Sequence, residues 1–189
     1  IWVASSAERF VVEIAATWLV VSAPICVSVK DANLVEFSAW SCEVVSEATG
    51  AAVAGMFYPA SPAVLTATVD KLLAARHPTP AVQPKALIVP HAGYIYSGST
   101  AAIAYASLAP WAKTIRRVIL LGPTHRVAVN GIALPEAEAF STPLGTIRLD
   151  AQAIASIADL PQIVFSDKVH AQEHSLEVHL PFLQRALAD

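Results

Sequence analysis

The chain has 189 residues, of which 55% are hydrophobic and 14% charged, and this composition excludes an intrinsically disordered protein. Its formal net charge of −3 does not suggest an anionic partner, so we expect neither nucleic acid nor a membrane as a partner. The two cysteines, Cys26 and Cys42, form no C-x-x-C pair, which argues against a zinc ribbon, a thioredoxin-like site or a disulfide framework. A cytoplasmic protein is the expectation that follows.

The first quarter of the chain differs from the remainder. Residues 1–48 contain no glycine, whereas residues 49–189 contain all seven. Residues 11–29 are mostly apolar and near transmembrane length, although Glu13 interrupts them and Pro24 would kink a helix. Three interpretations stay open: a membrane or signal segment, a buried helix followed by a strand near residue 25, or sequence foreign to the domain. We therefore predict an extension of uncertain origin over residues 1–48 and a main domain over residues 49–189.

Turn residues separate successive elements in the first part of the main domain. An apolar turn at residues 55–59 is followed by Ser61 and Pro62, an N-cap and first-position pair that begins a helix ending near residue 76. Apolar runs at residues 86–89 and 118–121 show no alternation, which predicts two parallel strands buried on both faces. A helix of small residues, 99–108, is expected between these strands.

The second part of the main domain is less regular. We expect short strands at 132–134, 146–149 and 162–165, a turn at 143–145, and a helix over 151–158 with Asp150 as its N-cap. The final segment is helical in composition, but Pro181 should divide or kink it. This order predicts an α/β protein, a three-layer αβα arrangement with a mainly parallel central sheet that is incomplete at the C-terminus.

A histidine follows each of the two predicted buried strands. His91 and His125 are about one strand–helix–strand unit apart, and such a unit usually places its parallel strands side by side. Neighbouring strands lie about 4.8 Å apart, so both imidazoles could reach one metal ion at the carboxyl edge of the sheet. Imidazole suits iron, copper, zinc and nickel, and two histidines with a carboxylate suit non-haem iron. For either histidine alone, a turn residue bonded to backbone is the favoured interpretation, and only the pair makes a metal site an equally good one.

A second group of titratable side chains lies at residues 170–179, which contain three histidines and two glutamates. On a helix, Glu173, His174 and Glu177 would lie near one face. They could supply a ligand, a carboxylate that orients a ligating imidazole, or a general base. The alternative is a solvated helix start, where acidic residues are favoured by the helix dipole. His179 is expected to be structural.

Two tyrosines flank the predicted pocket, and other familiar motifs are missing from the sequence. Tyr94 and Tyr96 could bind a substrate, or at least one of them could simply pack. There is no Gly-x-Gly-x-x-Gly or P-loop motif and no Gly-x-Ser-x-Gly elbow. Nucleotide binding through those loops and hydrolase chemistry at such an elbow are therefore not supported. His77 is expected to be an exposed helix end.

Five blocks in a fixed order make the sequence similar to a known family. Together they closely resemble the Memo family, whose bacterial and archaeal members are called AmmeMemoRadiSam system protein B. The resemblance covers about residues 51–189, and the order of five blocks makes it far more specific than any single block. The blocks lie at residues 54–59, 90–98, 121–125, 142–145 and 173–181.

The resemblance implies a fold similar to class III extradiol ring-cleaving dioxygenases, which are non-haem iron enzymes. Two family metal-site residues match His91 and His125, so a cofactor such as Fe(II) or copper is expected. The block that matches Glu173 and His174 would line the same pocket and is the expected source of catalytic groups. The family's third metal-site residue, a cysteine, comes later in the family pattern than residue 189.

The resemblance leaves two functions open. The first is a metal-dependent, dioxygenase-like oxidoreductase. The second is a non-catalytic module that binds a peptide or protein and acts with a radical-SAM protein and an AMMECR-type protein. A third hypothesis is a fragment that does not fold stably without the later strands of the sheet.

Overall fold

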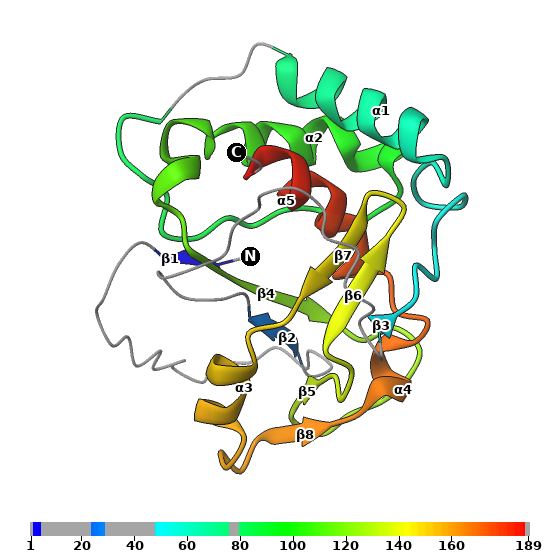
Figure 1. Ribbon diagram of the computed structural model, residues 1–189, viewed down its shortest axis with the longest axis vertical. Helices are drawn as coiled ribbons and strands as arrows, with labels where there is room; N and C mark the ends of the chain where they lie inside the picture. The colour runs from blue at the N-terminus through cyan, green and yellow to red at the C-terminus, as the bar shows by residue number, and fades with distance from the viewer. Residues whose placement is uncertain (1, 5–23, 29–47, 76–79, 188–189) are drawn as a thin grey trace.

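A computed structural model describes residues 2–4, 24–28, 48–75 and 80–187 of the chain. Helices and two sheets make up this part, and the predicted α/β class is confirmed (Figure 1). The expectations for most of residues 1–48, including Cys42, and for His77 lie outside the described residues. Among the described residues, no helix is both long and apolar enough to cross a membrane.

The larger sheet has the strand order β1-β4-β2-β5-β8. Strand β4 pairs antiparallel with β1 and with β2, whereas the β2–β5 and β5–β8 pairings are parallel. The sheet formed by the described residues is therefore mixed. Its strands are β1 (Trp2–Ala4), β2 (Pro24–Ser28), β4 (Arg117–Pro123), β5 (Ile132–Leu134) and β8 (Ile163–Phe165).

The strand predicted at residues 86–89 is wrong, because this segment forms no strand and Ile88 is 99% exposed. An apolar run becomes a strand only where a neighbouring strand offers free backbone groups. Both edges of β4 are already paired, one with β1 and the other with β2, so β4 offers no free edge to residues 86–89. The prediction that β4 is covered on both faces is also wrong in part. Val118 and Leu120 are buried, but Leu121 is 40% exposed.

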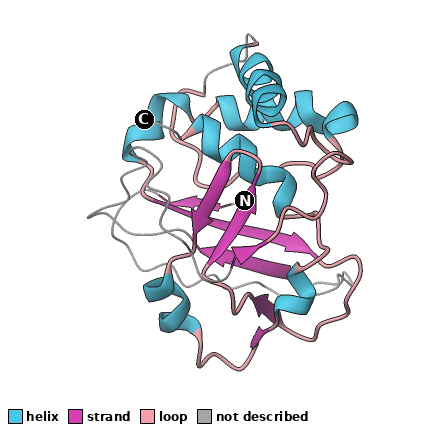
Figure 2. Cartoon of the chain, turned by 45° about the vertical axis from the view of Figure 1, so that its right-hand side comes forward, coloured by secondary structure: helices cyan, strands magenta, loops and turns pink. Residues whose placement is uncertain are grey.

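A smaller sheet has the order β3-β6-β7 and consists of a hairpin with one added strand. Strands β6 (Ala139–Thr142) and β7 (Gly145–Arg148) pair antiparallel, and β3 (Ala48–Thr49) runs parallel to β6. The predicted turn at 143–145 is confirmed, and Gly145 takes a φ of 117° that favours glycine. Figure 2 shows the hairpin lying across the strands of the larger sheet.

Three helices pack together at one end of the molecule: α1 (Pro62–Ala74), α2 (Tyr94–Ala106) and α5 (Leu180–Ala186) (Figure 1). Leu65 and Val69 of α1 are fully buried in this contact. The ring of Tyr105 in α2 stacks on Phe182 in α5, with centroids 5.1 Å apart.

The helix ends follow the sequence signals in part. Pro181 lies in the first turn of α5, and a short 3₁₀ helix, η2 (Glu177–His179), precedes it, so the predicted division at this proline is confirmed. Helix α2 begins five residues earlier than predicted. Its first turn is held by a bond from the Tyr94 amide to the Phe57 carbonyl, a contact between segments distant in sequence.

The remaining helical elements lie between the strands. They are η1 (Ala109–Thr114), α3 (Ala151–Ile157) and α4 (Asp167–His170). Asp150 caps α3 as predicted, because its carboxylate accepts a bond of 2.9 Å from the Ala153 amide. The same carboxylate is fully buried and lies 3.3 Å from the guanidinium of Arg117, which links α3 to β4.

Candidate metal centre

Three imidazole rings meet beside the carboxyl end of β4. The ring centroids of His125 and His174 are 4.4 Å apart, and those of His91 and His125 are 5.2 Å apart. His91 and His174 complete the triangle at 5.7 Å. One ligand atom from each side chain lies within 4.8 Å of the others. We call these three residues the histidine triad.

Close packing of the segment before η2 against the end of β4 brings His174 to His125. The Ser175 hydroxyl donates a bond of 2.7 Å to the Pro123 carbonyl. A Cβ atom on Gly122 would lie only 2.9 Å from side-chain atoms of Leu176 and of Ser175. Only glycine therefore lets the two segments approach this closely without a shift.

The carboxylate of Glu173 lies behind the triad and organises it. Its Oε1 atom is 2.9 Å from Nδ1 of His125 and accepts bonds from the backbone amides of His174 and Ser175. Its Oε2 atom accepts a bond of 2.6 Å from the His125 amide. Nδ1 of His174 is also 3.3 Å from the same carboxylate. One buried side chain thus fixes the backbone and the ring of His125, and leaves Nε2 of that ring free for a ligand.

The electrostatics of the site favour the neutral forms of His91 and His174 and the ionised form of Glu173. Burial, followed by the nearby His125, lowers the pKa of His91, and burial also lowers the pKa of His174. Burial alone would raise the pKa of Glu173, but the hydrogen bonds from His125 and Ser175 outweigh it and lower the pKa. Neutral imidazole is the form that binds metal ions.

The triad fits a transition-metal ion. Three imidazole nitrogens with a carboxylate bonded to one ring are a common donor set for zinc, iron, copper or nickel. Bonds of about 2.0–2.1 Å from metal to nitrogen would draw the three ligand atoms closer together than the 4.8 Å limit within which they lie. Among the described residues this is the group of histidine and acidic side chains that could hold a metal ion.

Glu177 does not share a face with Glu173 and His174, and that prediction is wrong. Residues 171–176 form turns rather than a helix, so helical spacing does not apply. Glu177 instead accepts bonds from the amides of Ala52 and Val53 and from the hydroxyl of Tyr58. Its role is to tie the segment before α1 to η2.

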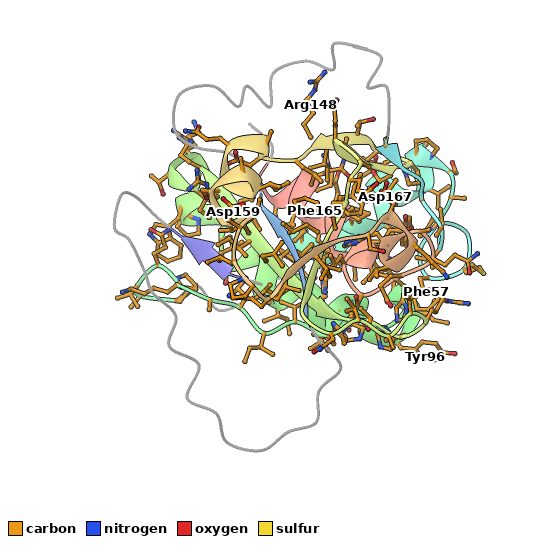
Figure 3. The ribbon with its side chains drawn as sticks, turned by 90° about the horizontal axis from the view of Figure 1, so that it is seen from below. Phe57, Tyr96, Arg148, Asp159, Phe165 and Asp167 are labelled. Carbon is orange, nitrogen blue, oxygen red and sulfur yellow. The ribbon has the colours of Figure 1, made fainter. Side chains whose placement is uncertain are left out.

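The structure separates the two predicted substrate-binding tyrosines. Tyr94 is buried, and its hydroxyl donates a bond of 2.9 Å to the Val178 carbonyl, while its ring packs on Phe182. Tyr96 is 80% exposed on the first turn of α2. Substrate binding stays a prediction for both residues. Figure 3 shows Tyr96 on the same side of the molecule as Phe57.

Two further residues lie at the site, and sequence reasoning assigned a functional role to neither. The ring of Phe57 lies against His174, with centroids 4.5 Å apart, although its sequence position indicates only an apolar turn. His170 is buried to 3% exposure beside Phe140 and near Glu173. Its place among closely spaced histidines and glutamates was the signal available, but that spacing does not show which ring points inward. His179 is buried next to Tyr105, as expected for a structural residue.

The fold and the site together define an α/β protein with a histidine cluster suited to a transition metal. The family model described as Memo-like protein matches residues 50–189, and the chain belongs to the Memo family.

Named relatives come from bacteria, archaea and vertebrates. A MEMO1 family protein of Aquifex aeolicus is 41% identical over 134 residues, which cover 71% of this chain and 48% of that protein. A MEMO1 family protein of Ignicoccus hospitalis is 39% identical over 150 residues, covering 73% of this chain and 52% of that protein. Protein MEMO1 of Danio rerio is 38% identical over 138 residues, which cover 71% of this chain and 44% of that protein. The chain thus spans about half the length of the curated relatives it matches.

Proposed function

We propose that this chain binds a transition-metal ion through His91, His125 and His174. We further propose that it forms part of a metal-dependent oxidoreductase related to the non-haem iron dioxygenases. The observation that supports this most directly is the triad itself, with one ligand atom from each ring within 4.8 Å of the others. Fe(II) or copper is the proposed metal, because both bind imidazole and both support redox chemistry.

We propose that Glu173 orients the ring of His125 and the backbone that carries His174. It holds the proton on Nδ1 of His125, which directs Nε2 of that ring towards the shared centre of the triad. Its bonds to the amides of His174 and Ser175 fix the backbone that carries the third imidazole. Because three or more donors satisfy it, Glu173 is a poor general base while it stays in this arrangement.

His174 has two possible roles within this proposal, and they have different signatures. As the third ligand it would be required for metal to bind. As an acid–base group beside a two-histidine site it would be required for turnover but not for metal binding. The 4.4 Å contact with the ring of His125 favours the ligand role. Phe57 covers one side of the His174 ring and would exclude water from it.

A bound redox-active metal would supply Lewis acidity and electrons for reaction of an aromatic or enediol-like substrate with O₂. The test is oxygen consumption by anaerobically iron-loaded protein with a panel of catechols. We expect uptake that is abolished in His91→Ala and in His125→Ala. Equal uptake in wild type and both variants, or none in a metal-loaded wild type, would contradict the oxidoreductase proposal.

The second candidate is a peptide- or protein-binding module, and exposed apolar side chains favour it. Ile95 and Tyr96 are 85% and 80% exposed on the first turn of α2, four and five positions after His91. Bulky exposed residues of this kind are typical of interaction surfaces. The proposed partners are a radical-SAM protein and an AMMECR-type protein. Capture of either by wild type and equally by a His91→Ala, His125→Ala variant, but not by Tyr96→Ser, would support this candidate.

A further inference from the structure

A small, partly open cavity lies beside Glu173. Its volume is about 10 Å³, close to the least that accommodates one water molecule. The polar side chains that line it are those of Thr49, His170, Glu173 and Glu177. His170, Glu173 and Glu177 are each at most 5% exposed. The cavity is therefore a small polar space beside Glu173, whose carboxylate holds His125.

One side chain in this cavity has an unused polar atom. Nε2 of His170 is buried and has no hydrogen-bond partner among the described residues. The other ring nitrogen bonds to the backbone of Ala133. A carbonyl accepts a proton rather than donating one, so Nδ1 carries the hydrogen and Nε2 is an acceptor. A buried acceptor left without a donor costs about 1–3 kcal/mol, which makes a filled site the favoured state.

The carboxylates in the cavity also lack donors on one side. Oε2 of Glu173 accepts a bond from the His125 amide, and Oε2 of Glu177 accepts one from the Ala52 amide, which leaves a lone pair on each oxygen. The side chains of His170, Glu173 and Glu177 therefore line one small space. The space needs a small molecule with two donors, and water has the right size and chemistry.

We propose that one buried water molecule occupies this cavity, donating one hydrogen to Nε2 of His170 and the other to the carboxylate of Glu173. His170 then acts as a positioning residue: through the water it limits rotation of Glu173, and through Glu173 it orients the ring of His125. The water site stands on the geometry of the cavity alone. Its consequence for metal affinity rests on the proposed function.

The first test uses the metal-free, ¹⁵N-labelled protein and two variants at one position. His170→Phe keeps the ring and its packing on Phe140 but removes the acceptor, whereas His170→Gln restores a polar atom. We expect a long-lived water to give NMR cross-peaks with backbone amides around the cavity in wild type and in His170→Gln, but not in His170→Phe. Histidine ¹⁵N spectra should show the Nδ1–H form of His125 in wild type, and a mixture of tautomers in His170→Phe. A wild type without the water signal would overturn the proposal.

The second test measures the dissociation constant for Zn²⁺ in the same three proteins. We expect His170→Phe to bind about 3- to 10-fold more weakly, less than the effect of removing a direct partner of a ligand, and His170→Gln to bind within about 2-fold of wild type. Equal affinity in His170→Phe and wild type would overturn the positioning role. If wild type shows the water and the His125 tautomer but no zinc binding, the water site stands and the proposed metal function fails. Urea unfolding midpoints of both variants show whether loss of the fold, rather than loss of the water contact, weakens zinc binding.

Discussion

Glu173 contacts more of the candidate site than any other single side chain described above. It contacts the backbone and ring of His125 and the backbone that carries His174, while burial shields these bonds from water. Such outer partners of ligating histidines commonly determine metal affinity as strongly as some ligands do. The consequences of this arrangement can be measured one residue at a time.

The first prediction concerns Glu173→Gln. The change keeps size and burial but replaces one acceptor oxygen with an amide donor, which would face the donors of His125 and Ser175. We expect Zn²⁺ affinity to fall about 10- to 100-fold, measured by competition with a chelator of known affinity.

The matched control for this prediction is Asp150→Asn. Asp150 is also a fully buried carboxylate, but it caps α3 and pairs with Arg117 instead of contacting the triad. It should lose stability and keep its zinc affinity. An equal fall in affinity for both variants would show that the effect comes from general loss of stability, and would remove Glu173 from the site.

The residue types at the site could be predicted from the sequence, but the role of each residue could not. The spacing of His91 and His125 predicted that they would meet, and they do. Glu173 and Glu177 could not be told apart, since either could face the histidines if the segment were helical. The turns at 171–176 direct Glu173 to His125 and Glu177 to the segment before α1. These turns depend on tertiary contacts that local sequence does not encode.

At the scale of elements, the site depends on how closely the segment before η2 approaches β4. The prediction is that Gly122→Ala destabilises the fold, because its Cβ would lie 2.9 Å from Leu176 and Ser175. Overpacking of this kind costs about 1–3 kcal/mol. Urea unfolding should report the loss, and zinc affinity should fall with it as His174 shifts.

Gly50→Ala is the comparison for this test. A Cβ at Gly50 would meet no atom within 4 Å, so its free energy of unfolding should stay close to that of wild type. Equal stability of Gly122→Ala and wild type would contradict the close packing described for β4.

The elements themselves were predictable where a local signal determines them. Ser61 and Pro62 begin α1, Asp150 caps α3 and Pro181 divides the last helical segment, each as expected. The segment at 86–89 has a strand composition but forms no strand beyond an isolated bridge at Ala86, because pairing is decided by the arrangement of the whole sheet. His91 still reaches His125, since the anchored first turn of α2 places it there rather than the end of a strand.

At the scale of the whole molecule, buried neutral histidines make stability depend on pH. Burial, and then the nearby His91, lower the pKa of His179 to about 3 from an ordinary value of 6.5. Below pH 6.5 the unfolded chain binds a proton at this residue that the folded chain does not, so stability falls as pH drops towards 3. The slope from this residue is at most about 1.4 kcal/mol per pH unit.

The prediction is tested by urea unfolding between pH 7.5 and 4 with a chelator present. His179→Gln should show a shallower loss of stability below pH 6.5 than wild type, and no difference in slope above it. Parallel curves for the two proteins across this range would mean that His179 is not held neutral in the fold. His170 should contribute in the same direction, because burial lowers its pKa also.

Metal content after anaerobic purification and reconstitution with Fe(II) is the decisive measurement of whether the three imidazoles bind one metal ion. We expect about one ion per chain in wild type and in His179→Gln, and loss of that ion in His91→Ala, His125→Ala and His174→Ala. Retention in His174→Ala alone would assign that residue to proton transfer instead. No ion in wild type, or full retention in all three triad variants, would show that the histidine triad is not a metal site.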